Sequence, residues 1–270
     1  MDISTINSIA IMISDLGRGA LYVVVTLMCF GFGRLARSRS SEHMIADELL
    51  RLSWYLSVFW VLGILLNLGL KHQICAPRPW WIDTSLVPIN PRPARGFGMP
   101  SGHTQSAVGV ALACSGVAMI LKRHARARWW GGLASRASIC LIGLGWVLAI
   151  AWSRIHLNAH SLAQVSAGGL LGVAWAAGVV YAGRDRRGVM ILLLFGILCS
   201  GMSIWASLSP LELPEVWRSV ILGRGVTPPS APDLVKVLGL ITLALCLCAL
   251  PLRRSSRLST RHSSAPELNV

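Results

Sequence analysis

Long apolar runs separated by short polar segments make up most of this chain. Residues 3–14 place isoleucines at helical spacing between polar residues, which predicts a short interfacial helix. Most of the later runs approach or reach the roughly 20 residues that a helix needs to cross a bilayer, so the pattern predicts an all-α, polytopic membrane helix bundle of about six or seven transmembrane helices. The predicted spans are 20–33, 54–70, 104–121, 139–152, 161–182, 189–207 and 234–252.

The composition excludes a soluble globular domain. Of the 270 residues, 54% are hydrophobic and 13% are charged, and the mean hydropathy is +0.60. Without internal repeats, we expect one membrane-embedded domain over residues 1–252. The basic segment 253–270 is predicted to be a disordered cytoplasmic tail.

Positive charge predicts how the spans are oriented. The formal net charge is +14, but the basic residues alternate with apolar spans, so we interpret them as topology signals and expect no nucleic-acid partner. Sixteen Lys and Arg residues lie in the segments 34–51, 122–136, 184–187 and 253–261. Seven spans would place all four segments on the cytoplasmic side. We therefore expect the N-terminus and the segments 71–103, 153–160 and 208–233 to face outward. The size of the chain and the absence of eukaryotic retention signals favour an integral protein of a bacterial inner membrane, in which this outer side is the periplasm.

Candidate catalytic groups gather on this predicted outer side, within residues 71–164. Ser101 and Gly102 precede an apolar run, so they are predicted to offer free backbone N–H groups and a positive helix-dipole end to an anion. Three cations without an acidic partner suit a phosphate. Two imidazoles beside them suit phosphoryl transfer, since one can attack phosphorus while the other protonates the leaving oxygen. The candidate residues are Lys71, Arg78, Ser101, Gly102, His103, Arg154 and His160.

Three spaced motifs resemble the signature of the type-2 phosphatidic acid phosphatase superfamily, which comprises integral-membrane lipid phosphatases related in their site to vanadium haloperoxidases. The motifs are Lys71-x6-Arg78-Pro79, Pro100-Ser101-Gly102-His103 and Ser153-Arg154-x5-His160. The resemblance implies that His160 is the nucleophile and His103 the general acid. It implies that the phosphate is held, without a metal or cofactor, by Lys71, Arg78, Ser101, Gly102 and Arg154.

Gln164 departs from the family pattern, which usually places an Asp four residues after the nucleophilic histidine. The i, i+4 spacing puts Gln164 on the same helix face as His160, where its side-chain oxygen can accept the Nδ1–H. A neutral amide does not stabilise an imidazolium by charge, so we expect a lower pKa for His160 than with an Asp partner. A glutamine here resembles the dolichyl-diphosphatase and glucose-6-phosphatase branches.

The resemblance and the interfacial position together favour hydrolysis of a lipid phosphate or diphosphate, through a phosphohistidine, on the outer membrane face. Candidate substrates are a polyprenyl diphosphate or a phosphatidate-like glycerolipid, with a soluble sugar phosphate as the minor option. Other functions stay open from the sequence: transfer of the phosphoryl group to another lipid or sugar, anion transport, or lipid binding without catalysis. Trp80 and Trp81 are predicted to anchor the chain at the membrane interface, with guidance of a lipid chain as the alternative.

Overall fold

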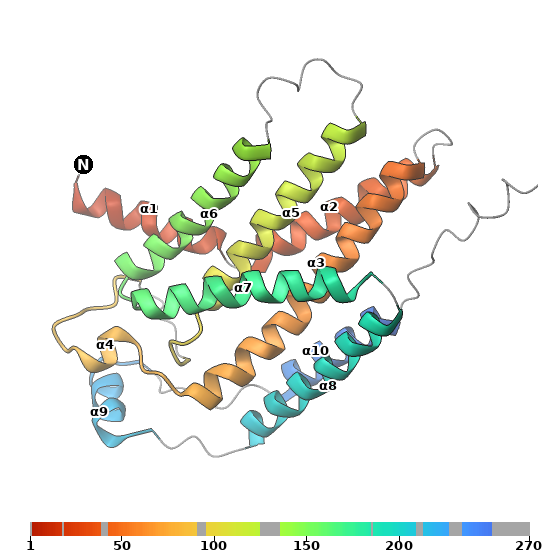
Figure 1. The fold of residues 1–270 in the computed structure, drawn as a ribbon. Coiled ribbons are helices and arrows are strands. Elements are labelled where there is room, and N and C mark those ends of the chain that lie inside the picture. The colour runs from red at the N-terminus through yellow and green to blue at the C-terminus, as the bar shows by residue number, and fades with distance from the viewer. Residues whose placement is uncertain are drawn as a thin grey trace, which may run out of the picture.

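A computed structural model describes residues 2–17, 19–38, 43–90, 96–124, 136–184, 186–208, 213–226 and 234–249. These residues form helices and no strands, so the predicted all-α fold class is confirmed (Figure 1). The helices are α1 (Ile3–Leu16), α2 (Gly19–Ser38), α3 (His43–Ile74), α4 (Pro79–Ile82), α5 (Gly102–His124), α6 (Arg136–His156), α7 (Leu162–Ala182), α8 (Arg186–Leu208), α9 (Glu215–Gly223) and α10 (Leu234–Ala249). The predicted tail 253–270 lies outside the described residues.

Five helical stretches in the described part of the chain are long and apolar enough to cross a membrane, which indicates an integral membrane protein. They are Leu21–Ser38, Met44–Ile82, Ser138–His156, Leu162–Ala182 and Arg187–Leu208. All except Leu162–Ala182 are longer than predicted. The 32 residues of α3 rise about 48 Å, more than the roughly 30 Å of a bilayer core. The predicted span 104–121 falls on α5, and residues 234–249 of the predicted span 234–252 form α10, while 250–252 lie outside the described residues.

Helix α3 is the central element of the bundle. It contacts α2, α5, α7, α8 and α10, and its side chains Trp54, Phe59 and Leu62 are buried in the main apolar core. Side-chain donors on neighbouring helices also bond to its carbonyl oxygens. Trp175 Nε1 donates to Phe59 O over 2.9 Å, and Ser203 Oγ donates to Leu65 O over 3.0 Å. These bonds hold α7 and α8 against α3.

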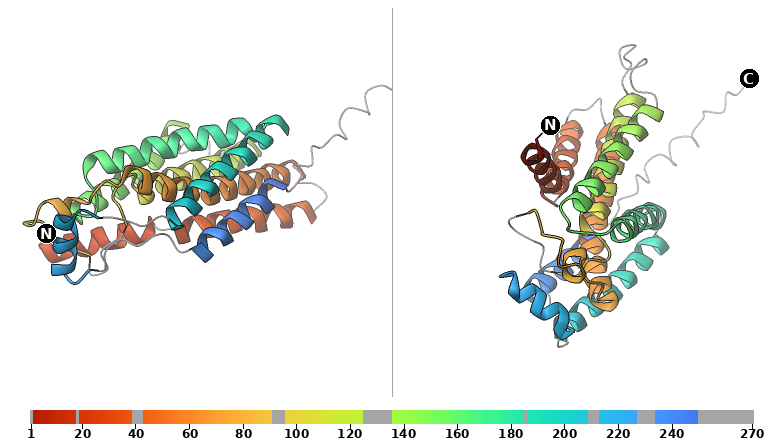
Figure 2. Two further views of the ribbon diagram at one scale, coloured as in Figure 1. Left: turned by 90° about the horizontal axis from the view of Figure 1, so that it is seen from below. Right: turned by 90° about the vertical axis from the view of Figure 1, so that its left-hand side faces the viewer.

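One end of the bundle carries additional helices outside the predicted spans. Figure 1 places α1, α4 and α9 at the end where α6 finishes and α7 begins, and the left view in Figure 2 shows the same grouping. Sequence analysis did not predict α4 or α9. It did predict the interfacial helix at residues 3–14, which the structure extends to Leu16.

The prediction that Trp80 and Trp81 are interfacial anchors is wrong. Each tryptophan is only 1% exposed, and the pair forms a second small core with Phe97 and Ile221. The amphipathic helix α9 supplies Ile221, so it covers these rings instead of leaving them to the bilayer. This second core packs the segment that follows α3 against α9.

Candidate active site

The fold brings all eight residues that the sequence singled out to the end of the bundle that carries α4 and α9 (Figure 1). Each comes from the end of a helix or from the segment next to it. Lys71 lies in the last turn of α3, and Arg78 precedes α4. The remaining six are Ser101, Gly102 and His103 at the start of α5, Arg154 in the last turn of α6, and His160 and Gln164 at the start of α7.

His160 is buried, with 2% of its surface exposed. Its Nδ1 lies 3.2 Å from Oε1 of Gln164, which is the contact predicted from their spacing. An amide oxygen only accepts hydrogen bonds, so this contact assigns the proton to Nδ1. The other ring nitrogen, Nε2, then carries a lone pair and lies 3.4 Å from Nη1 of Arg78. The lone pair on Nε2 of His160 therefore faces the cationic side of the site, where it accepts a hydrogen bond from Nη1 of Arg78.

The surroundings of His160 favour its neutral form. Burial lowers the pKa of His160 well below its ordinary value of 6.5, because a charged imidazolium loses hydration there. The positive charges of Arg78, Arg154 and Lys71 lower that pKa further, and His103 adds to the effect. A neutral imidazole with a free Nε2 is the form that can attack an electrophile.

Gln164 links His160 to the loop that carries Arg78. The side-chain Oε1 of Gln164 also accepts a hydrogen bond from the backbone N–H of Ser161 over 3.2 Å. The backbone N–H of Gln164 donates to Ser161 Oγ over 3.3 Å. These two bonds form a capping box at the start of α7. The side-chain Nε2 of Gln164 donates to the carbonyl oxygen of Pro77 over 2.7 Å. A carboxylate has no donor for that carbonyl. The amide therefore performs a bridging role that the usual Asp does not.

Arg78 joins segments on both sides of the site and is 2% exposed. Its Nε donates to Gly96 O over 2.6 Å, its Nη1 to Ala159 O over 2.6 Å, and its Nη2 to Phe97 O over 3.3 Å. The rigid guanidinium fork lets one side chain make all of these bonds. Arg78 thereby fixes the segment before α5 relative to the residue that precedes His160.

The start of α5 lies directly against α7. A Cβ added to Gly168 would approach the carbonyl oxygen of Ser101 too closely and would lie 3.1 Å from its carbonyl carbon. The backbone N–H of Ser101 donates to Gln164 O over 3.0 Å. The prediction that this N–H is free to bind an anion is therefore wrong. The first turn of α5, where Gly102 and His103 lie, has further backbone N–H groups that are not needed for bonds within the helix and could donate to an anion.

Arg154 has a partner that sequence analysis missed. Its side chain is 4% exposed, and Nη1 donates to Oγ of Ser14 over 2.5 Å. Ser14 lies on α1, far away in sequence, and no spacing rule relates it to Arg154. Lys71 is half-buried and close enough to both arginines to interact with them electrostatically. The described residues contain no group of three or more His, Cys, Asp or Glu that could hold a metal ion.

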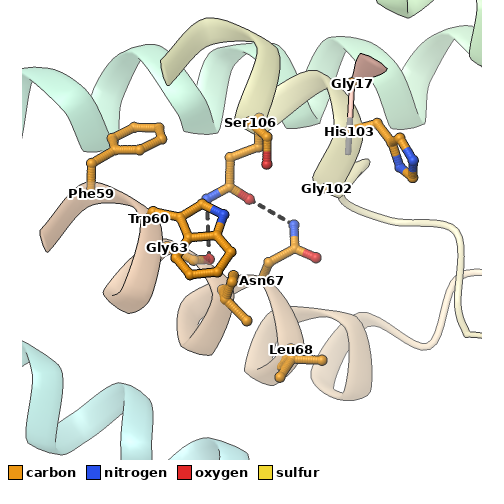
Figure 3. A pocket seen from close by; sticks show the side chains of 11 residues that line it. Gly17, Phe59, Trp60, Gly63, Asn67, Leu68, Gly102, His103 and Ser106 are labelled. Carbon is orange, nitrogen blue, oxygen red and sulfur yellow. Dashed lines mark hydrogen bonds between the residues drawn. The ribbon is translucent and has the colours of Figure 1, made fainter. Parts of the chain in front are cut away.

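An apolar cavity of about 260 Å³ opens beside His103 and Gly102, between α3 and α5. Figure 3 shows Phe59, Trp60 and Leu68 of α3 around it, with His103 at its edge. Two amide side chains of its wall bond to each other and to the backbone. Asn67 Nδ2 donates to Gln105 Oε1 over 2.7 Å, and Gln105 Nε2 donates to Gly63 O over 3.2 Å (Figure 3).

Comparison with protein families gives a match that spans the site. A family model described as the PAP2 superfamily matches residues 51–188, about half of the chain. The chain belongs to the PAP2 superfamily. The matched region contains all eight candidate residues and runs from within α3 into the first turn of α8.

Members of the PAP2 superfamily are generally phosphatases, which supports a phosphoester hydrolase activity for this membrane protein. Searches of curated proteins and of solved structures gave no significant match. The comparisons therefore establish the PAP2 family and leave the substrate and the roles of individual residues to be argued from the site.

Proposed function

We propose that this protein hydrolyses a lipid phosphate or diphosphate through a phosphohistidine on His160, on the outer face of the membrane. The observation that carries the proposal is the geometry of His160. Gln164 accepts from Nδ1, so that the lone pair on Nε2 faces Arg78. The ring is buried among cations that keep it neutral.

The first step forms a bond from Nε2 of His160 to phosphorus and breaks the bond from phosphorus to the leaving oxygen. His103, in the first turn of α5, gives a proton to that oxygen. In the second step a water attacks phosphorus and its proton passes to His103. The bond from phosphorus to Nε2 then breaks, which releases phosphate and restores both histidines.

Positive groups surround the position of the phosphoryl group. Arg78, Arg154 and Lys71 converge from three helix ends, and the start of α5, where the first-turn N–H groups can receive an anion, lies at the same end of the bundle. Such groups stabilise the charge on the equatorial oxygens during transfer, and losing one donor of this kind typically costs about 10²–10³ in rate.

The apolar cavity supports a lipid as the substrate. Its lining residues Phe59 to Leu68 precede Lys71 on α3, and at 1.5 Å per residue they lie about 5–18 Å further along the helix, toward the bilayer. The amides of Asn67 and Gln105 already bond to each other, so the cavity favours hydrocarbon over a sugar. At about 260 Å³ it is smaller than the roughly 300–1,000 Å³ of pockets that enclose a whole ligand, so it would hold the part of a lipid chain nearest the phosphate.

The distribution of exposed arginines supports an outward-facing site. At the site end Arg78 and Arg154 are buried and Arg218 of α9 is exposed. Arg34, Arg37 and Arg184, at the other end, are exposed, as expected for cytoplasmic topology signals. A bacterial inner membrane with the site facing the periplasm is the arrangement that we propose.

The decisive test is phosphate release by purified protein in detergent. The panel contains undecaprenyl diphosphate, phosphatidate, phosphatidylglycerophosphate, sphingosine phosphate and glucose 6-phosphate, with H160A as the inactive control. We expect release from at least one lipid and little from glucose 6-phosphate. Equal rates for wild type and H160A would contradict the mechanism, and a clear preference for glucose 6-phosphate would contradict the lipid assignment.

A tryptophan pair tests the role of the cavity. I64W places a large ring on the cavity wall, whereas L170W adds the same ring to a position on α7 that is 72% exposed. We expect I64W to raise KM for a long-chain lipid phosphate and to affect a short-chain analogue less. Unchanged kinetics in I64W, or equal effects in both variants, would place the lipid chain elsewhere.

A further inference from the structure

We propose that the N-terminal helix α1 belongs to the active site, with Ser14 as a positioning residue for Arg154. The inference rests on the proposed function only in taking phosphate as the group that Arg154 binds. Ser14 is fully buried, and its hydroxyl oxygen accepts a hydrogen bond from Nη1 of Arg154 over 2.5 Å.

Helix α1 docks on α6 through a stripe of small and polar residues. Asn7, Ala10, Ser14 and Gly17 follow one another at spacings of three and four, so they share one face of the helix. Ala10 and Ser14 are 0% exposed, and a Cβ added to Gly17 would lie 2.8 Å from Cδ1 of Ile150 on α6. This face permits close approach of the two helices.

Two large apolar residues of α1, Met12 and Leu16, lie on its other faces. They are 58% and 44% exposed. The docked face is therefore not the one that would bury the most hydrocarbon. Close contact and hydrogen bonding distinguish it instead, and its innermost hydroxyl meets the side chain of Arg154.

Arg154 connects α1 to the nucleophile. Its carbonyl oxygen accepts the backbone N–H groups of Ala159 and His160, over 3.1 and 3.2 Å. Its guanidinium is planar and holds its N–H donors in a fixed fork, so a bond to one nitrogen orients the remaining donors. Ser14 therefore sets the direction in which Arg154 presents those donors to a phosphate.

A second contact between α1 and α6 offers a matched control. Oδ1 of Asn7 lies 2.9 Å from Nε2 of His156, and Asn7 is two helical turns from Ser14 on the same helix face. Removing the Asn7 side chain weakens the docking of α1 and leaves the acceptor for Arg154 in place. The S14A and N7A variants thus separate orientation of Arg154 from docking of the helix.

The test measures the dissociation constant for inorganic phosphate by calorimetry, with the full chain in detergent. Hydrogen bonds to charged groups are strong enough that S14A is expected to weaken phosphate binding about tenfold or more. S14T, which keeps a hydroxyl, is expected to retain most of the affinity, and N7A is expected to change it by less than S14A does.

A double-mutant cycle with R154A decides between positioning and a purely structural role. We expect S14A to weaken phosphate binding in the wild-type background and to have no further effect once Arg154 is absent. Wild-type affinity in S14A, or an equal loss in both backgrounds, would overturn the proposal. Phosphate binding without release from any lipid would reject the lipid phosphatase and leave the role of Ser14 standing, whereas no phosphate binding by wild type would overturn both.

Discussion

The contact between Gly168 and Ser101 gives a sharp prediction for the G168A variant. In G168A the added Cβ would lie 3.1 Å from both the carbonyl carbon and the Cβ of Ser101, and closer still to the carbonyl oxygen. The added Cβ belongs to α7, and the atoms that it meets are mainly backbone atoms of Ser101. Backbone atoms do not change rotamer as a flexible side chain does, so α7 and the start of α5 must move apart.

The displacement needed to restore an ordinary contact is roughly 1 Å, and a misplacement of that size can cost about 100-fold in rate. The move would separate His160 and Gln164 on α7 from the first turn of α5, which carries Gly102 and His103. It would also lengthen the bond from Ser101 N–H to Gln164 O, now 3.0 Å. We therefore expect kcat/KM for the best lipid phosphate to fall about 100-fold in G168A.

G169A is the matched control on the same helix. A Cβ at Gly169 would meet only Cγ2 of Thr104, at an ordinary 3.6 Å. Elsewhere in a helix, replacing glycine by alanine stabilises by about 0.5–1 kcal/mol, so G169A is expected to keep its activity and to unfold at a slightly higher temperature. Phosphate release and thermal unfolding of both variants check the prediction. Equal kcat/KM values in G168A and G169A would refute the close approach of α7 to Ser101.

Three further predictions concern the neighbours of His160 and the outer core. Because burial and nearby cations lower the pKa of His160 well below 6.5, kcat/KM should stay constant as the pH falls to 6.5. In Q164E a carboxylate favours the imidazolium and raises the pKa of His160, so kcat/KM should begin to fall at a higher pH than in wild type. Superimposable pH profiles of wild type and Q164E would contradict the contact between residue 164 and His160. R78K should lower the free energy of unfolding by roughly 3 kcal/mol, because an ammonium does not reach all the carbonyl oxygens that the guanidinium bonds; denaturation that matches wild type would show that those bonds contribute little. Ile221 is fully buried and Leu222 is 55% exposed, so I221A should destabilise the protein by about 2–5 kcal/mol and L222A by much less; equal unfolding temperatures for the two variants would contradict the second core.

The parts of the site that follow from local spacing were predictable from sequence. The i, i+4 relation put Gln164 beside His160, and the structure has that contact. The alternation of spans predicted that the last turns of α3 and α6 and the first turns of α5 and α7 lie on one side of the membrane. Figure 1 shows these four helix termini at one end of the bundle. Periodicity and topology are enough for both inferences, because each depends only on positions along the chain.

Contacts between remote segments were not predictable in this way. Ser14 and Arg154 lie 140 residues apart, and only the docking of α1 on α6 brings them together. Trp80 and Trp81 are of the residue type that commonly anchors a chain at the membrane interface, yet α9 covers them through Ile221. The position of Ser101 just before a helix predicted that its backbone N–H has no acceptor within the chain. Because α7 lies close to Ser101, the carbonyl oxygen of Gln164 accepts that N–H. In each case a tertiary neighbour supplied a partner that spacing alone does not show.

Trapping the covalent intermediate tests the central claim most directly. A lipid substrate labelled in the transferred phosphate would be mixed with enzyme, quenched within a turnover and the protein digested for mass mapping. We predict one labelled phosphoryl group on the peptide that contains His160, stable in alkali and lost in acid, and absent from H160A. Steady phosphate release without a label on His160, or with the label on another residue, would contradict a phosphohistidine mechanism.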